Sequence, residues 1–269
     1  MIISSLIRKI FNERFIDSVK ALYDQNIRNE QKIRELPRFT RDKADILTYS
    51  FDFPDARSFI SMREDIWNKQ IYYFRTKSQK PYIVDCGSNI GLSVIYFKHL
   101  FPDARIAAFE PDPKLFQYLS DNLADNSFTD IEIHQKAVCD SNAILPFKTD
   151  GADGGKITAS NSDQMVQTVS LNEFLKTKVD LLKLDIEGNE LKVLRSCKEH
   201  LHLVRNLFIE YHSFKDKAQE LSEILRILEQ HGFRYFLNSA TPRNCPFDFV
   251  SEEDMDLQIN IYAKQIQKD

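Results

Sequence analysis

Several features that would assign this 269-residue sequence to a class of protein at once are missing. No apolar stretch approaches the roughly 20 residues that span a bilayer, and the N-terminus has no signal-peptide core or small-residue cleavage site. The four cysteines form no Cys-x-x-Cys pair, which favours buried reduced thiols over a disulfide framework. We therefore expect a cytoplasmic protein without a transmembrane segment.

Dense clusters of lysine and arginine are also missing. The formal net charge is -4, and positive charges are spread along the chain among a slightly larger number of acids. A protein that follows a phosphate backbone needs a basic stripe or patch. We do not expect nucleic acid as a substrate or partner.

Glycine is scarce, with seven residues in the chain, and two of them lie in the most informative stretch, Tyr82-Ile-Val-Asp-Cys-Gly-Ser-Asn-Ile-Gly91. A short apolar run that stops at Asp85 and continues through Gly87 and Gly91 predicts a strand, a tight turn and a helix. Glu110 ends the next apolar run, where a doubly wound sheet offers a carboxylate to a ribose diol. The two blocks predict a nucleotide-type cofactor with an unphosphorylated ribose.

The third glycine of the Gly-x-Gly-x-x-Gly fingerprint is missing, and its absence bears on the cofactor. The negative charge of Asp85 opposes a pyrophosphate but favours a ligand with an ammonium or sulfonium group. S-adenosylmethionine therefore fits better than NAD. An NAD-dependent oxidoreductase is a less favoured alternative, as is an ordinary turn with a polar cap.

The chain from Tyr82 onward alternates apolar strands with segments of helical period, which predicts an α/β protein with a mostly parallel sheet. The last two strands are separated by too short a loop for a helical crossover, so the final strand should run antiparallel. This is the class I, Rossmann-like methyltransferase sheet, which we assign to residues 76–269. The predicted strands are 82–85, 105–110, 131–138, 179–185, 206–212, 233–238 and 256–264, with helices near 90–100, 113–125, 189–199 and 215–231.

Residues 1–75 form a predicted N-terminal helical extension. Apolar residues at helical spacing predict one or two amphipathic helices over residues 1–35, followed by a strand pair within 45–53 and a helix over 59–74. The extension could cover the cofactor pocket as a lid or form a homodimer, and membrane-surface binding is the less favoured reading. A glycine-rich insertion at 149–156 predicts a mobile loop, either a hairpin tip or a flap over the substrate.

Polar residues end the fourth and fifth predicted strands, at the sheet edge where α/β proteins bind ligands. Lys183 and Asp185 share one face of their strand, as an ion pair or as part of a site. Glu187 follows at a helix N-terminus, where capping is an alternative role. Glu210 and His212 share a side by the two-residue period, and His212 is the candidate general base.

Three blocks give the sequence its resemblance to a known family. They are Val84-Asp-Cys-Gly-Ser-Asn-Ile-Gly91, Ala108-Phe-Glu-Pro-Asp-Pro113 and Leu182-Lys-Leu-Asp-Ile-Glu-Gly-Asn-Glu190, with Ile209-Glu-Tyr-His212 as a looser fourth. Between about 80 and 240 the chain resembles the FkbM family of S-adenosylmethionine-dependent methyltransferases. The resemblance implies methyl transfer to a hydroxyl, on a sugar, a glycan or a natural product.

The resemblance also implies roles for individual residues. Glu110 would hold the ribose hydroxyls, with Pro111 beside it, and residues from Ala137 to Asp140 would flank the adenine. Asp185, Glu187 and His212 would face the acceptor. From their strand positions, Lys183 is a further catalytic candidate and Glu210 a further substrate contact. The methionine and sulfonium side would be lined by Asp85, Gly87, Asn89 and Gly91.

Two further alternatives concern metal and catalysis. Some O-methyltransferases of related fold hold the acceptor with a divalent metal, and Asp185 with Glu210 or His212 could provide such a site; we favour a reaction without metal. A non-catalytic binding scaffold of the same fold is the other alternative. Acids at nearly every strand end argue against it, because a scaffold has no need of costly charges in a cleft.

Overall fold

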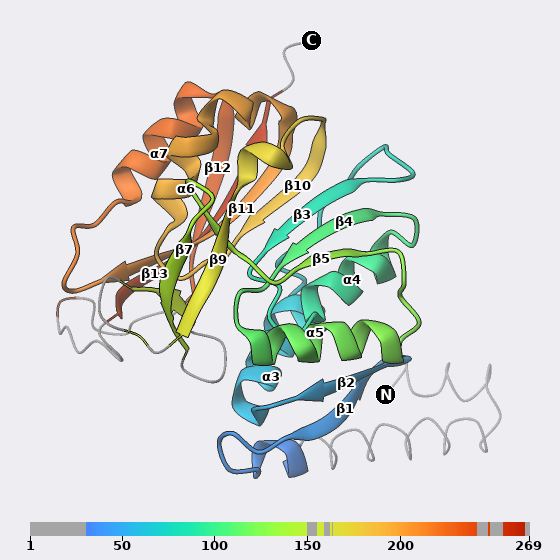
Figure 1. Ribbon diagram of the computed structural model, residues 1–269. Helices are drawn as coiled ribbons and strands as arrows, with labels where there is room; N and C mark the ends of the chain where they lie inside the picture. The colour runs from blue at the N-terminus through green and yellow to red at the C-terminus, as the bar shows by residue number, and fades with distance from the viewer. Residues whose placement is uncertain are drawn as a thin grey trace, which may run out of the picture.

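The computed structural model describes residues 31–149, 155–158, 162, 164–240, 247 and 255–266. A seven-stranded sheet in the order β12-β13-β11-β10-β3-β4-β5 forms its centre (Figure 1). β13 runs antiparallel to both neighbours, while the pairs from β11 to β5 are parallel. The predicted fold class, including the antiparallel last strand, is confirmed. No helix in the described part of the chain is long and apolar enough to cross a membrane.

The seven strands fall close to their predicted positions. They are β3 (Tyr82–Cys86), β4 (Arg105–Phe109), β5 (Glu132–His134), β10 (Val179–Leu184), β11 (Val204–Phe214), β12 (Phe233–Ser239) and β13 (Met255–Gln265). The helices of this region are α4 (Leu92–Leu100), α5 (Pro113–Asp125), α6 (Glu190–Cys197) and α7 (Leu221–Gln230), with the 3-10 turns η2 (Leu171–Glu173) and η3 (Lys198–Leu203). α7 begins later than predicted because β11 continues to Phe214 and a turn follows it.

Two hydrophobic cores cover the two faces of the sheet. In β3, Val84 and Cys86 pack with α6 and α7, whereas Ile83 packs with α4 and α5. In β10, Leu182 and Leu184 join the first core, as the two-residue strand period requires. The helix pairs therefore lie on opposite faces, and the carboxyl ends of the strands are left for polar groups (Figure 1).

The predicted third strand, 131–138, is divided in the structure. β5 pairs with β4 and ends at His134, and β6 (Ala137–Cys139) pairs instead with β9 (Gln164–Ser170). With β7 (Ile144–Lys148) and β8 (Lys156–Ile157), these strands form a second sheet in the order β6-β9-β7-β8. The strand divides because the inserted chain supplies a new hydrogen-bonding neighbour for β6. Most of the glycine-rich segment, residues 150–154, lies outside the described residues.

The described part of the N-terminal extension is not wholly helical. β1 (Asp42–Ile46) and β2 (Tyr49–Phe53) form the expected strand pair, an antiparallel hairpin. The helix predicted over 59–74 is instead α3 (Ala56–Arg63), begun by the Asp55 cap and continued by the π-helical turn η1 (Glu64–Asn68). It ends early, and Gln70 has a φ of 55°. The amphipathic segment up to residue 30 lies outside the described residues.

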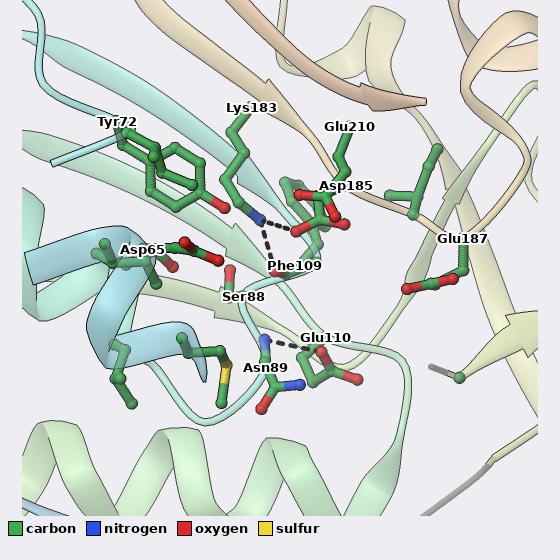
Figure 2. Close-up of a pocket in the computed structure, with 18 of the residues that line it drawn as sticks. Asp65, Tyr72, Ser88, Asn89, Phe109, Glu110, Lys183, Asp185, Glu187 and Glu210 are labelled. Atoms are coloured by element: carbon green, nitrogen blue, oxygen red, sulfur yellow. Dashed lines mark hydrogen bonds and ion pairs between the residues drawn. The ribbon is translucent and has the colours of Figure 1, made fainter. Parts of the chain in front are cut away.

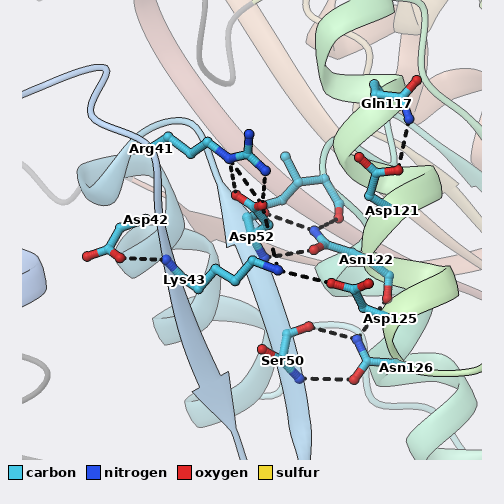
Figure 3. A network of polar contacts seen from close by, with 11 residues as sticks. Arg41, Asp42, Lys43, Ser50, Asp52, Gln117, Asp121, Asn122, Asp125 and Asn126 are labelled. Carbon is cyan, nitrogen blue, oxygen red and sulfur yellow. Dashed lines mark hydrogen bonds and ion pairs between the residues drawn. The ribbon is translucent and has the colours of Figure 1, made fainter.

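Two amide side chains, Asn122 within α5 and Asn126 at its C-cap, attach the hairpin to the main domain (Figure 3). Asn126 bonds both the N–H and the carbonyl of Ser50, and Asn122 does the same with Asp52. Asp52 in turn accepts hydrogen bonds from Arg41. Phe51 is fully buried in the same core as α4 and α5, so this part of the extension and the sheet share one interior.

Candidate active site

A cavity of about 500 Å³ lies at the carboxyl ends of the central strands, in the size range of small-molecule sites. One wall is formed by the ends of β3, β4, β10 and β11, and the others by η1, the second sheet and the paired β12 and β13. Its polar lining residues are Ser61, Asp65, Lys69, Tyr72, Ser88, Asn89, Ser93, Glu110, Lys136, Lys183, Asp185, Glu187, Glu210, Asn238, Ser239, Gln258 and Asn260.

The turn after β3 is pressed against the end of β10. The N–H groups of Gly87 and Ser88 both donate to the carbonyl of Phe109, which ties the turn to β4. Gly87 has a φ of 85°, and a Cβ there would lie 1.9 Å from the carbonyl oxygen of Asp185. Only glycine permits both the backbone conformation and this approach. Asn89, with a φ of 49°, completes a turn that exposes backbone to the cavity.

Glu110 lies beside this turn and lines the cavity. Its two carboxylate oxygens accept the N–H groups of Asn89 and Asp112, both at 2.9 Å. Burial is the main influence on its pKa, which rises to about 8, although these two hydrogen bonds act in the opposite direction. The carboxylate is held in a fixed orientation, with lone pairs left to accept hydrogen bonds from a diol.

A buried ammonium links the two halves of the cavity wall. Nζ of Lys183 lies 3.2 Å from an oxygen of Asp85 and donates to the carbonyl of Gly87 at 2.8 Å. It also lies 3.3 Å from an oxygen of Asp185 (Figure 2). Burial alone would lower the pKa of Lys183, but the two carboxylates raise it above its ordinary value. Ser93 donates to the other oxygen of Asp85 at 2.6 Å. Lys183 thus links β10 to Asp85 and to the turn after β3.

Asp85 itself is fully buried and does not line the cavity. It acts on the cavity through Lys183 and through the position of the turn. This differs from the direct contact with the methionine side that the family resemblance implies.

Carboxylates gather on the other side of the cavity, around the ends of β10 and β11. Burial raises the pKa of Asp185, and the nearby Glu210 raises it further. Burial also raises the pKa of Glu187 to about 8, partly offset by His212. Glu187 has a φ of 58°, an uncommon conformation for a residue with a long side chain. Such backbone strain is concentrated at functional sites.

His212 lies behind these carboxylates and is not among the residues that line the cavity. Nδ1 is 3.1 Å from Glu190, and Nε2 is 3.5 Å from Glu187 and 3.6 Å from Glu210. Burial would lower the pKa of His212, but the surrounding carboxylates raise it well above its ordinary value. Nδ1 is hydrogen-bonded to Glu190, and Nε2 faces the carboxylates of Glu187 and Glu210. His212 lies next to the cavity wall without lining it, and its direct role as general base stays a prediction.

One group of side chains has the geometry of a metal site. Ligand atoms of Asp185, Glu187 and His212 lie within 4.8 Å of one another. The positive charge of a protonated His212 already offsets the negative charge of the neighbouring carboxylates. A metal ion bound here would therefore have to displace the proton of the imidazole. The donor set could hold a divalent ion, with one nitrogen and two oxygen ligands.

The other predicted residues divide into two groups. Pro111 and Ala137 line the cavity beside Glu110, on the side expected for the adenine. Asp140 does not line it, because its carboxylate turns to Lys192, 3.1 Å away. Gly91, also outside the lining, precedes α4 with a φ of 92°, and a Cβ there would meet the side chain of Leu119 at 2.8 Å.

Sequence reasoning missed a set of lining residues that lie far from the three blocks. Tyr72, from the N-terminal extension, is buried with its ring 5.4 Å from the Lys183 ammonium. Figure 2 shows it on the far side of Lys183 from Asp185. The only available signal was the expectation that the extension covers the pocket. The other missed polar residues are Ser61, Asp65, Lys69, Lys136, Asn238, Ser239, Gln258 and Asn260.

Comparison with known proteins gives this cavity a context. The chain is 30% identical over 210 residues to methyltransferase sdnD of Sordaria araneosa, covering 63% of this chain and 80% of that protein. It is 28% identical to the hexuronic acid methyltransferase AglP of Haloferax volcanii, over 52% of this chain and 60% of the relative. The 2-O-methyltransferase NoeI of Sinorhizobium fredii is 25% identical, over 49% of this chain and 63% of that protein.

A solved structure and a family model agree with these relatives. The FkbM methyltransferase of Methylobacillus flagellatus superposes with a TM-score of 0.50 at 19% identity, over 71% of this chain and 45% of that one, a likeness of fold. The methyltransferase FkbM domain model matches residues 85–235, which is more than half of the chain and includes all three sequence blocks apart from Val84. The chain therefore belongs to the FkbM methyltransferase family.

Proposed function

We propose that this protein is an S-adenosylmethionine-dependent O-methyltransferase that acts on a hydroxyl of a sugar, glycan or natural product. The observation that carries the proposal is one continuous cavity with two different ends. One end offers the glycine turn and the fixed Glu110 carboxylate, and the other offers Asp185, Glu187 and Glu210. The relatives AglP and NoeI, by their names, methylate a hexuronic acid and a 2-hydroxyl.

The cofactor would lie along the ends of β3 and β4. Glu110 would accept the ribose hydroxyls, and Phe109, Pro111, Ala137 and Val138 would form the apolar surface around the adenine. When bound, S-adenosylmethionine supplies an electrophilic methyl group on a sulfonium. The carboxylate of Asp185, beside the turn, favours that positive charge.

Glu187 is the best-placed group to receive the acceptor proton. It lines the cavity, and a pKa of about 8 gives it a basicity close to the working pH, where general bases are most effective. Asp185 and Glu210 would orient the acceptor hydroxyl by accepting its hydrogen bonds. Much of the acceleration would come from holding the oxygen in line with the methyl group.

His212 acts in this proposal as a positioning residue. Its positive charge lowers the pKa of Glu187 and holds that side chain against the strained backbone. Glu190 fixes the imidazole from behind through Nδ1, and its own carboxylate also accepts the N–H of Gly188.

Calorimetric titration with S-adenosylmethionine, S-adenosylhomocysteine and NAD tests the proposal. We expect both methionine derivatives to bind in the micromolar range and NAD not to bind. Glu110→Ala should weaken binding at least about 100-fold, because the ribose loses its acceptor and two N–H groups lose theirs. Glu132→Ala, at an exposed acid on β5, is the matched control and should bind like the wild type. Failure of the wild type to bind either derivative would overturn the proposal.

A further inference from the structure

A second cavity, of about 620 Å³, adjoins the first one. The two share the lining residues Ser61, Asp65, Lys69 and Ala240, so the second cavity, here called the outer cavity, adjoins the first one along α3 and η1. Its other walls come from the N-terminal extension, including residues before β1 and the exposed side of α3. An acceptor too long for the inner cavity would extend into it.

Positive charge predominates in the outer cavity. Four cationic side chains line it, against the two carboxylates of Glu64 and Asp65; the cations are Arg34, Arg38, Arg57 and Lys69. The inner cavity has the reverse balance, with five carboxylates, Asp65 included, against three lysines. In a chain with a net charge of -4, such a gathering of cations creates a local field that attracts anions.

The donors of the outer cavity are only partly used within the protein. Nε of Arg38 donates to Asp55 at 2.8 Å, which holds the guanidinium in place. Lys69 is paired with Asp65 at 2.8 Å. Arg57 is exposed and has no ion-pair or hydrogen-bond partner among the described residues. A guanidinium of this kind presents a planar fork of donors that matches phosphate oxygens.

We propose that the acceptor carries a phosphate ester, which binds in the outer cavity while its hydroxylated ring enters the inner one. This inference rests on the proposed function, because it assigns the two ends of one acceptor. The acids and amides of the inner cavity can accept hydrogen bonds from the hydroxyls of a neutral ring and donate hydrogen bonds to them. The arginines of the outer cavity supply the countercharge that the inner cavity lacks.

The test uses the full-length protein and probes that do not depend on the identity of the sugar. Inorganic pyrophosphate and inorganic phosphate are titrated calorimetrically into the protein saturated with S-adenosylhomocysteine. Pyrophosphate represents a diphosphate diester, and phosphate represents a monoester. The variants are Arg57→Ala and Arg57→Glu, with Arg226→Ala and Arg226→Glu as controls at an exposed arginine of α7 far from both cavities.

We expect one of the two anions to bind, and the tighter one indicates which ester the acceptor carries. Arg57→Glu should weaken that binding about tenfold or more, and Arg57→Ala less, because a charge-assisted hydrogen bond is lost without a repulsive charge being added. The Arg226 variants should bind the anion like the wild type. S-adenosylhomocysteine should keep its affinity when pyrophosphate is present.

Three results would overturn the inference. They are no binding of either anion, equal losses in the Arg57 and Arg226 variants, and competition between pyrophosphate and S-adenosylhomocysteine, which would place the anion in the inner cavity. Because the affinity for S-adenosylhomocysteine is measured first, a protein that binds it but neither anion retains the proposed function and refutes only the phosphate site. A protein that does not bind it refutes both.

Discussion

The two ends of the inner cavity are built in different ways. At the cofactor end, backbone N–H groups and carbonyls fix the turn and Glu110 through short hydrogen bonds. At the acceptor end, three carboxylates crowd around one buried imidazole and raise its pKa. The first end is determined mainly by backbone geometry, whereas the second depends on charge balance. Substitutions should therefore change structure at one end and proton affinity at the other.

The largest expected effect comes from Gly87→Ala, since this glycine joins the two ends. The new Cβ would overlap the Asp185 carbonyl at 1.9 Å on a backbone of positive φ, so β3 and β10 must separate. We expect a loss of about 3 kcal/mol or more in unfolding free energy, measured by denaturant titration.

Gly232→Ala is the matched control for that substitution. It also has a positive φ, of 79°, but nothing lies within 4 Å of its Cβ position, so it should cost only about 1 kcal/mol. Similar losses of unfolding free energy in the two variants would show that the positive φ alone requires glycine at position 87, and not the contact between the turn and β10.

The next effect is on turnover. Glu187→Gln removes the proposed base and should lower kcat about 100-fold in a methyl-transfer assay, with cofactor affinity unchanged. Glu132→Gln, an exposed acid outside the cavity, should leave kcat as it is. Full activity in Glu187→Gln would show that Glu187 is not the base and would leave Asp185 or Glu210 as the candidate.

A smaller effect separates positioning from catalysis. The positive charge of His212 lowers the pKa of Glu187, so His212→Asn should raise that pKa and move the acidic limb of the pH–rate profile upward by about one unit. Turnover at high pH should recover toward the wild-type value. A fall in activity that is equal at every pH would indicate a purely structural role for the imidazole.

The smallest effect is on stability as a function of pH. Glu110 and Glu187 have pKa values of about 8 in the folded protein, above the ordinary 4.5, so the folded state binds more protons between these values. His212, with its raised pKa, acts in the same direction, and its contribution is lost as pH rises through the folded value. Unfolding free energy should therefore fall as the pH rises from 5.5 to 8.5.

Glu187→Gln should flatten that decline, as measured by denaturant titration across the same pH range. Glu223→Gln is the control, because the Arg195 partner lowers the pKa of Glu223 and its linkage acts below about pH 4.5. Stability that is constant or increases with pH would contradict the raised pKa values.

The sheet and the cofactor end could be predicted from the sequence because local signals determine them. The apolar run before Asp85, the glycines after it and the acid at the end of β4 define a strand, a turn and a carboxylate that lines the cavity, within 30 residues. The acceptor end was only partly predictable. The two-residue strand period correctly placed Lys183 on the face of β10 opposite to Leu182 and Leu184. It could not show that the carboxylates of Asp85 and Asp185 both lie next to the Lys183 ammonium.

Contacts between distant segments account for the other differences. The two-residue period of β11 places Glu210 and His212 on the same side of the strand. The His212 imidazole nevertheless pairs with Glu190, at the start of α6, and does not line the cavity. Tyr72 enters the cavity because a segment outside the family motifs folds over the strand ends. The division of the third strand depends on pairing with β9, which follows an insertion and leaves no periodic signal in β6.

The two asparagines of α5 have a consequence for how copies of this chain behave together. Four residues of helix advance about 6 Å, close to two residues of strand, so Asn122 and Asn126 meet Ser50 and Asp52 in register, as a neighbouring strand would. These amides thus occupy backbone groups of β2 that would otherwise be open to pairing with another molecule. Substitutions that remove them should be recognised first by self-association during purification, while methyl transfer by the protein that stays in solution is retained.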